Sequence, residues 1–198
     1  MRGILALVVF TAAVVAVGLF GYVNHKIIPI GYTENAMDTN SAFSLTSSVF
    51  DKGTSIPAKF TCDGSEVNPP LSISGVPAGT QSLALVMVDP DIPQTFKDQM
   101  HIDEYVHWVL FDIPPETTEI ATGTTVGTSG ANSAGKNQYA APCPPPQYEP
   151  SEHRYIFTLY ALDSTLPLTT GASEADVEQA MDGHIISQTE LIGLYKRK

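Results

Sequence analysis

Four prolines occupy the five positions 142–146, and no other feature restricts the backbone of this chain as strongly. Proline lacks a backbone N–H and fixes φ, so a helix or a central strand is excluded there. The sequence therefore predicts a rigid surface loop. After this loop, His153–Leu162 forms a largely apolar strand pattern that places His153 and Tyr155 on one face and Arg154 on the other. A strand that begins with a histidine beside a rigid loop is suited to forming a small pocket.

Other apolar segments predict further strands. Residues 82–88 and Tyr105–Ile113 are apolar on both faces, which is typical of buried strands. Residues 117–138 are rich in Gly, Thr, Ser and Asn, and predict a long loop that contributes little to the core. Shorter patterns predict strands at residues 43–46 and 58–62, an edge strand at 69–75, and a closing strand or strand pair at Ile185–Tyr195.

One helix has a clear start signal. Ser173 is suited to cap it, and Asp176 stands at the capping-box position three residues later. Gly183 is expected to end this helix. Its apolar stripe consists of Val177, Ala180 and Met181. Many strands with one or two short helices predict a mainly β fold, a β-sandwich of two sheets.

The N-terminus carries a different signal. Residues 4–23 are apolar and uncharged, which is long enough to span a bilayer as a single transmembrane helix. A cleaved signal peptide is the alternative, because Ala16 and Gly18 offer small residues near a suitable position. An uncleaved anchor is favoured, since the apolar run continues beyond them. The expected segments are a signal anchor or signal peptide at 1–23, a linker at 24–42, and an extracytoplasmic domain, membrane-anchored or secreted, at 43–198.

The charge and the cysteines of the chain restrict its partners. The net charge is −11, so a nucleic-acid partner is not expected, because a phosphate backbone requires a basic patch. The same acidity opposes binding of the domain to an anionic membrane surface. Cys62 and Cys143 could form one disulfide in an exported protein, but their spacing does not decide it. Two unpaired cysteines are the favoured interpretation, because each lies in a loop with another role.

The three buried strands each carry a titratable residue at or near an end: Asp89, His107 and His153. If these strand ends converge, the three side chains line one cavity. A hydrogen bond between Asp89 and a histidine would set the tautomer of the ring. Ring N–H groups then suit a phosphate or a carboxylate, and the backbone N–H of Cys143, the last donor before Pro144, could add to them. The structural alternative is that Asp89 only caps the next turn and each histidine is an ordinary strand-end residue.

Two other interpretations use the same residues. In a hydrolase, Cys143 would be the nucleophile and His153 or His107 the base, which Asp89 would orient. A zinc site could instead be built from Asp89, Asp91, His107 and His153. Neither is favoured, because no helix N-terminus is evident to activate the thiol and the histidines lack the close spacing of metal ligands. We therefore expect a non-enzymatic binding domain without a metal or cofactor.

Three sequence blocks resemble those of the phosphatidylethanolamine-binding protein family, which includes the Raf kinase inhibitor protein. The blocks are Asp89-Pro90-Asp91-Ile92-Pro93, His107-Trp108, and Pro142-Cys143-Pro144-Pro145 followed by His153-Arg154-Tyr155. Residues 56–64, 69–71 and 159–163 are similar to the prokaryotic branch. Several blocks in the same order are far more specific than any one of them. The similarity extends from about Phe43 to the C-terminus.

The resemblance implies a two-sheet β-sandwich with a small anion pocket, and a cis peptide bond at Ile92–Pro93. The expected ligands are phosphate or phosphoethanolamine, whose ammonium group would suit Asp89 or Asp91. The ligand-binding residues that it implies, together with those proposed above, are Asp89, Asp91, His107, Cys143, Pro144, His153 and Tyr155.

The family also implies a modulator or inhibitor of other proteins, and relatives suggest a homodimer. A kinase or a protease is the partner class to consider, but an extracytoplasmic domain would not meet a cytoplasmic kinase. Protease inhibition is therefore the alternative function, with residues 117–138 as its candidate loop. The chain departs from the family at Ala140-Ala141, where glycines are usual, and in its longer, acidic segment 146–152.

Overall fold

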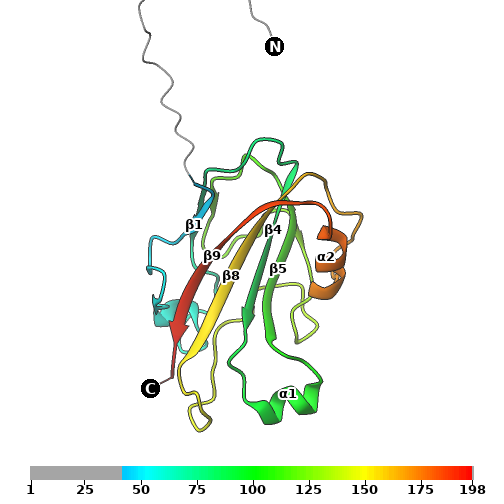
Figure 1. The fold of residues 1–198 in the computed structure, drawn as a ribbon. Coiled ribbons are helices and arrows are strands. Elements are labelled where there is room, and N and C mark those ends of the chain that lie inside the picture. Colours follow the sequence, from blue (N-terminus) through cyan, green and yellow to red (C-terminus); the bar gives the residue numbers. More distant parts are fainter. Residues whose placement is uncertain (1–41, 198) are drawn as a thin grey trace, which may run out of the picture. The chain divides into compact units, whose positions relative to one another are not determined.

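Two β-sheets make up the fold of residues 42–197, the part of the chain that this computed structural model describes (Figure 1). The small sheet has the strand order β1-β3-β6 and the large sheet β2-β9-β8-β4-β5-β7. The strands of the small sheet are β1 (Ser44–Thr46), β3 (Leu71–Ser74) and β6 (Glu119–Ile120). Those of the large sheet are β2 (Thr54–Ser55), β4 (Ser82–Asp89), β5 (Tyr105–Ile113), β7 (Thr128–Ser129), β8 (His153–Leu162) and β9 (Ile185–Tyr195). The helices are the 3-10 helix η1 (Ala58–Phe60), α1 (Gln94–Met100) and α2 (Glu174–Met181).

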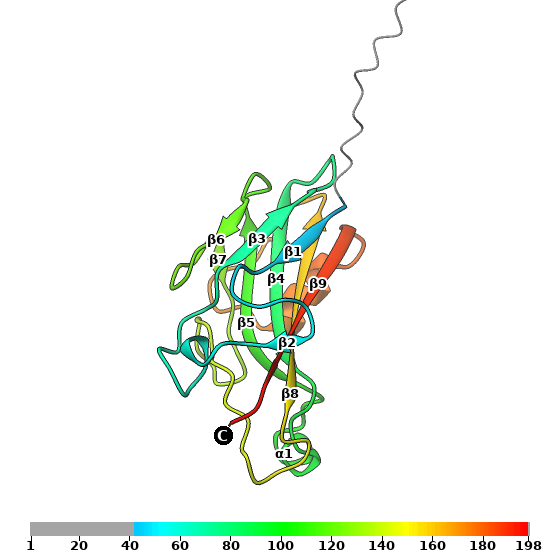
Figure 2. The same ribbon diagram turned by 90° about the vertical axis from the view of Figure 1, so that its left-hand side faces the viewer.

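Strand β4 lies at the centre of the large sheet, between β8 and β5, and pairs with both in antiparallel fashion. All eight of its residues are buried. One face of the large sheet packs against the small sheet, where Leu85 and Met87 join a core that includes Ile73. The other face packs against α2, where Ala84 meets Val177. Figure 2 shows β1 and β3 lying across one side of the large sheet. Two covered faces explain why this strand is apolar throughout.

Helix α2 confirms the start signal in the sequence. The Ser173 hydroxyl accepts a hydrogen bond from the Asp176 N–H at 3.2 Å, and the Asp176 carboxylate accepts one from the Ser173 N–H at 3.0 Å. Val177 and Met181 are buried against the sheet. The helix ends at Met181, two residues before Gly183, whose φ is +78°. The reciprocal cap satisfies backbone donors at the start of a helix too short to be stable alone.

Three local predictions were wrong. Residues 58–60 form η1 rather than a strand, because the Phe60 N–H donates a hydrogen bond to the Pro57 carbonyl at 2.9 Å. In this turn the Phe60 side chain is buried. Strand β3 is central rather than at an edge, since β6 pairs with its outer side. The segment 117–138 contributes more than a loop: it supplies β6 and β7 and buries Ile120 and Asn132.

The predicted N-terminal anchor cannot be compared with the structure. Residues 1–23 and the linker up to residue 41 lie outside the described residues. Within residues 42–197, no helix has both the length and the apolar character needed to cross a membrane.

Candidate ligand-binding pocket

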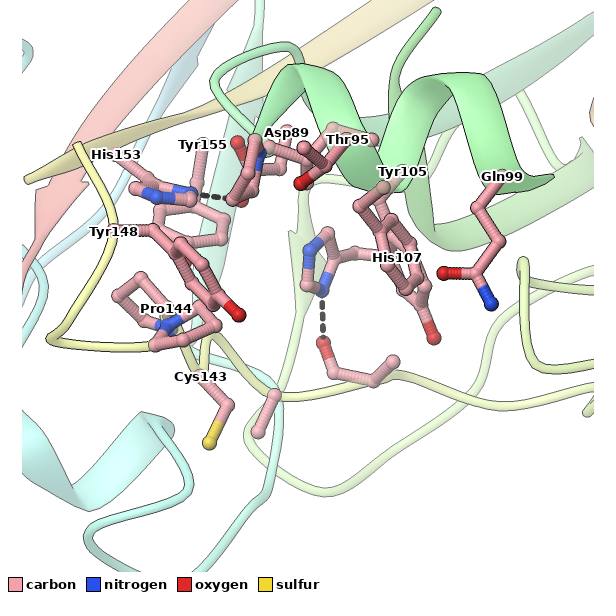
Figure 3. A pocket seen from close by; sticks show the side chains of 16 residues that line it. Asp89, Thr95, Gln99, Tyr105, His107, Cys143, Pro144, Tyr148, His153 and Tyr155 are labelled. Atoms are coloured by element: carbon pink, nitrogen blue, oxygen red, sulfur yellow. Dashed lines mark hydrogen bonds and ion pairs between the residues drawn. The ribbon is translucent and has the colours of Figure 1, made fainter. Parts of the chain in front are cut away.

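A pocket of about 370 Å³ opens at one end of the large sheet (Figure 3). Its position follows from the topology. Because β4 is antiparallel to β5 and β8, its C-terminal end lies beside the N-terminal ends of both neighbours. Asp89 therefore pairs with Tyr105 in the sheet and lies close to the first residue of β8, His153. The side chains that line the pocket are those of Asp89, Ile92, Pro93, Thr95, Phe96, Gln99, Tyr105, His107, Ala140, Ala141, Cys143, Pro144, Pro145, Tyr148, His153 and Tyr155.

His153 and Asp89 form a buried pair at the base of the pocket. Nδ1 of His153 lies 2.7 Å from Oδ2 of Asp89, and the two residues are 0% and 3% exposed. The other carboxylate oxygen of Asp89 accepts the backbone N–H of Asp91 at 2.9 Å. The carboxylate thereby makes Nδ1 of His153 a donor and leaves Nε2 as the unbonded nitrogen of a ring that lines the pocket. Nε2 is buried and has no hydrogen-bond partner among the described residues.

His107 is held by the backbone instead of a carboxylate. Its Nδ1 lies 2.8 Å from the carbonyl oxygen of Ala140, which can only accept a hydrogen bond. Nδ1 of His107 therefore carries a proton. Burial lowers the pKa of His107, and the hydrogen bond to Ala140 and the charge of Asp89 only oppose this shift. The ring is consequently neutral near pH 7, with its second nitrogen unprotonated.

The hydroxyl of Tyr155 is the second unpartnered group of the pocket. It is buried, and no described residue forms a hydrogen bond with it. Burial raises the pKa of Tyr155, and the nearby Asp89 carboxylate adds to this, although the two groups are not placed to bond. The phenol therefore stays protonated. An unsatisfied buried polar group costs about 1–3 kcal/mol, so two of them in one pocket point to a polar ligand.

Aromatic side chains surround these polar groups. The ring of His107 lies between Tyr105 and Tyr155, at centroid distances of 4.9 Å and 5.2 Å. Phe96 on α1 and Tyr148 in the proline-rich loop line the mouth and are 37% and 47% exposed. Figure 3 shows Tyr148 and Tyr105 on opposite sides of the opening. Aromatic rings thus form much of the wall, and the two unpartnered polar groups lie at the base.

The structure brings six of the seven predicted ligand-binding residues to this pocket, all except Asp91. Asp91 turns away to form two hydrogen bonds with the Arg154 guanidinium, at 2.6 Å and 2.8 Å, and accepts the Arg154 backbone N–H at 2.9 Å. This pairing lowers the pKa of Asp91. The carboxylate therefore fastens the turn after β4 to the start of β8, and is not available to a ligand's ammonium group.

Sequence reasoning missed the contribution of α1, which supplies Thr95, Phe96 and Gln99 to the mouth. No local signal marks these residues, because they belong to a short helix without a buried side chain. Tyr105 could have been found, since it lies two positions before His107 on the same strand face. The predicted cis bond at Ile92–Pro93 was wrong: the bond is trans, and Pro93, with a φ of −55°, leads directly into α1.

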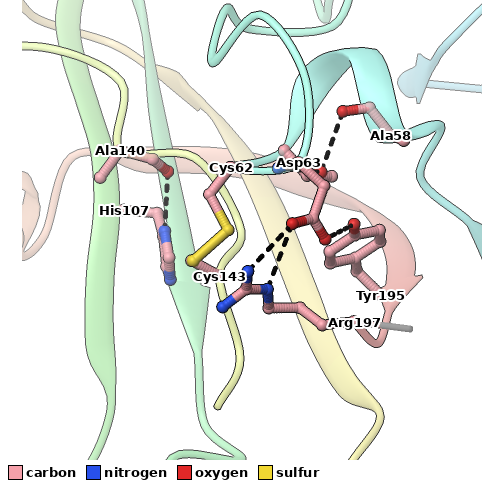
Figure 4. Close-up of a disulfide and its surroundings, with 9 residues drawn as sticks. Ala58, Cys62, Asp63, His107, Ala140, Cys143, Tyr195 and Arg197 are labelled. Carbon is pink, nitrogen blue, oxygen red and sulfur yellow. Dashed lines mark hydrogen bonds and ion pairs between the residues drawn. A yellow bond between two sulfur atoms is a disulfide. The ribbon is translucent and has the colours of Figure 1, made fainter. Parts of the chain in front are cut away.

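A disulfide joins Cys62 to Cys143, which corrects the preference for unpaired cysteines (Figure 4). The two Cα atoms are 5.4 Å apart although 81 positions separate them in sequence. The Cys62 N–H also donates to the Pro142 carbonyl at 3.1 Å, so the loop after η1 is fastened to the wall of the pocket. With both cysteines bonded, Cys143 offers no thiolate, and the predicted alternative of a cysteine hydrolase is wrong.

The donor set of the pocket does not resemble a metal centre. Within residues 42–197, no three or more His, Cys, Asp or Glu side chains are placed to hold a metal ion. Asp91 is held by Arg154, and the Nδ1 atoms of both histidines are already bonded. The geometry instead leaves ring nitrogens and a hydroxyl without a bonded partner among the described residues that line the cavity.

Comparison with known proteins finds relatives that match most of this chain. The family model described as phosphatidylethanolamine-binding protein matches residues 46–196. A UPF0098 protein of Methanothermobacter thermautotrophicus is 40% identical over 161 residues, which are 78% of this chain and 99% of the relative. A UPF0098 protein of Chlamydia muridarum is 38% identical, over 77% of this chain and 98% of the relative.

Two solved structures share the fold. A phosphatidylethanolamine-binding protein homolog from Chlamydia trachomatis has a TM-score of 0.73 and 38% identity, and the match covers 79% of this chain and 99% of that one. YbcL of E. coli, described as a member of the mammalian family, has a TM-score of 0.69 and 27% identity over the same shares. Together with the family match, these likenesses establish that the chain belongs to the phosphatidylethanolamine-binding protein family.

Proposed function

We propose that this protein binds a small phosphorylated anion, such as phosphate or the phosphoethanolamine headgroup, in the pocket between β4, β5 and β8. The observation that carries the proposal is a pair of buried groups at the base of the pocket that have no hydrogen-bond partner within residues 42–197, Nε2 of His153 and the hydroxyl of Tyr155. Neither would be retained without a partner, because each loses its hydrogen bonds to water on burial. Because His153 and Tyr155 line the same pocket, we expect one oxyanion to engage both groups.

The proposal is for binding without catalysis, as a modulator of other proteins. It is supported by the absence of a free thiol among the described residues, and by the lack of a carboxylate facing the pocket other than the bonded Asp89. Protease inhibition through residues 117–138 is less favoured. Asn68 and Asn132 bond this segment to itself and to the core at 2.9–3.1 Å, so it is not presented as a free loop.

We also propose that the domain works outside the cytoplasm. The disulfide supports this placement, because such bonds persist in oxidising compartments and are rare in the cytosol. The apolar segment 4–23 would supply the route of export and, if retained, a membrane anchor.

Calorimetry on a fragment that begins at Thr39 tests the binding proposal. Residues 39–198 form a compact unit, and solved relatives consist almost entirely of the matching part. Inorganic phosphate and phosphoethanolamine are titrated separately, so that a free anion and a lipid headgroup can be told apart. Both are expected to bind, and binding should be lost in His107→Ala and His153→Ala.

His184→Ala is the matched control, since His184 is an exposed histidine that pairs with Asp163 away from the pocket. It should bind both ligands as the unmodified fragment does. A folded fragment that binds neither ligand would refute the proposal.

A further inference from the structure

Both histidines of the pocket have one ring nitrogen committed and one available. Nδ1 of His107 donates to the Ala140 carbonyl, and Nδ1 of His153 donates to the Asp89 carboxylate. Each ring can therefore offer a ligand only its Nε2 atom. An Nε2 atom accepts a hydrogen bond when the ring is neutral and donates one only after the ring has taken up a proton.

The pocket has no permanent positive charge. Neither lysine nor arginine is among the lining residues that the structure describes. The two nearby cations are committed elsewhere: Arg154 pairs with Asp91, and the Lys97 ammonium donates to the Pro90 carbonyl at 2.8 Å. Asp89 adds a negative charge at the base. A bare dianion would therefore meet the lone pair of the neutral His107 ring and a carboxylate, which repel it.

The groups that bear on the two rings come from every neighbouring element. They are Asp89 at the end of β4, Asp91 after it, Lys97 on α1, Glu104 before β5, Tyr105 on β5, Arg154 and Tyr155 on β8, and Tyr148 in the proline-rich loop. Among them, the cations are Arg154, which Asp91 neutralises, and Lys97, whose ammonium donates to the Pro90 carbonyl. The surroundings therefore do not supply the charge that an oxyanion lacks.

We propose that the pocket selects oxyanions that bind together with protons, and so takes phosphate and phosphate monoesters in preference to sulfate. This inference rests on the proposed function and names its ligand class. In the complex, one proton lies between each Nε2 atom and a ligand oxygen, while the Tyr155 hydroxyl donates to a further oxygen. Dihydrogen phosphate brings both protons, and hydrogen phosphate brings one and takes the other from solvent.

Sulfate is disfavoured because it carries no proton at neutral pH. Both protons would have to come from solvent and reside on the rings, and burial opposes the charged form of His107. If His107 does not take up a proton, a sulfate oxygen faces the lone pair of its Nε2 atom, which leaves buried acceptors unsatisfied. The same reasoning ranks a phosphate monoester between the two, since its monoanion retains one hydroxyl.

Calorimetry on the fragment from Thr39 tests this selectivity. Phosphate, phosphoethanolamine and sulfate are titrated at pH 6, 7 and 8, each in two phosphate-free buffers with different heats of ionisation. The difference in heat between the buffers gives the number of protons taken up. We expect phosphate to take up about one proton at pH 8, its Kd to rise about tenfold per pH unit there, and sulfate to bind at least tenfold more weakly at pH 7.

Two variants separate the contributions. His107→Gln places a carboxamide N–H near the position of Nε2, and this donor does not need to take up a proton. The number of protons taken up should therefore fall by about one, and the affinity for sulfate should rise relative to that for phosphate. Tyr155→Phe should weaken both anions to a similar extent and leave proton uptake unchanged. Circular dichroism confirms that each variant is folded.

The outcomes are distinct. Equal affinities for phosphate and sulfate without proton uptake would overturn this inference while leaving the anion pocket intact. The same would follow from undiminished uptake in a folded His107→Gln variant. If the fragment binds none of the three anions, the proposed function fails, and the selectivity fails with it.

Discussion

Reduction of the disulfide is expected to destabilise the domain through its unfolded state. The bond joins two cysteines that are 81 positions apart in the sequence. For a closed loop of that length, the chain-entropy relation gives a stabilisation of about 4.5 kcal/mol. That is a large fraction of the 5–15 kcal/mol that typically stabilises a domain. The folded state should change less, because the Cys62 N–H keeps its bond to the Pro142 carbonyl.

The assay is guanidinium unfolding of the fragment from Thr39, followed by circular dichroism, with and without a dithiol reductant. The unfolding midpoint should fall strongly on reduction, with a smaller change in the slope of the transition. A Cys62→Ser, Cys143→Ser double variant is the control, since it should unfold at the reduced midpoint and ignore the reductant. A shift of less than about 0.5 kcal/mol in a protein shown by thiol titration to be oxidised would refute the entropy argument. Two free thiols in the untreated protein would refute the bond itself.

Three further substitutions test the packing and the caps. Ser173→Ala removes the capping hydroxyl of α2 and should reduce the free energy of unfolding by about 1 kcal/mol, as measured by denaturant titration. Gly193→Ala should cost about 1–3 kcal/mol in the same assay, because a Cβ there would lie 2.5 Å from Cγ1 of Ile56; an unchanged midpoint would show that the side chain moves aside freely. Burial and the neighbouring Glu178 raise the pKa of Glu174 from 4.5 to about 7 in the folded state. As the pH rises, the unfolded chain therefore loses this proton before the folded protein does. The free energy of unfolding should fall as the pH rises from 4.5 to 7. At pH 8 the Glu174→Gln variant should therefore have a free energy of unfolding about 1 kcal/mol higher than the unmodified protein, after allowance for solvent screening and for the helix dipole. At pH 4 the two proteins should be equally stable. An equal gain in stability at both pH values would contradict the assignment.

Local patterns in the sequence were enough to predict the long strands. The predicted bounds of Tyr105–Ile113, His153–Leu162 and Ile185–Tyr195 agree with β5, β8 and β9. Runs of apolar residues and their alternation depend only on neighbouring positions, so they can be recognised without knowledge of the fold. The cap of α2 is likewise contained within four residues, from Ser173 to Asp176.

The short elements were harder to predict, for a physical reason. The strands β6 and β7 contain two residues each, and they exist only because β3 and β5 offer partners for them. Such pairings join segments that are distant in sequence, and no local periodicity records them. The 3-10 turn η1 was mistaken for a strand because three residues are too few to distinguish the two periods.

The sequence by itself determined which residues could meet at the pocket: Asp89, His107 and His153 each stand near the end of a buried strand, and antiparallel pairing brings such ends together. Only the tertiary structure decided what each group does there. It paired Asp91 with Arg154 instead of a ligand, joined Cys62 to Cys143, and left one nitrogen of His153 without a hydrogen-bond partner in the described part of the chain. These outcomes depend on distances and directions in space between segments far apart in the chain, which residue spacing does not contain.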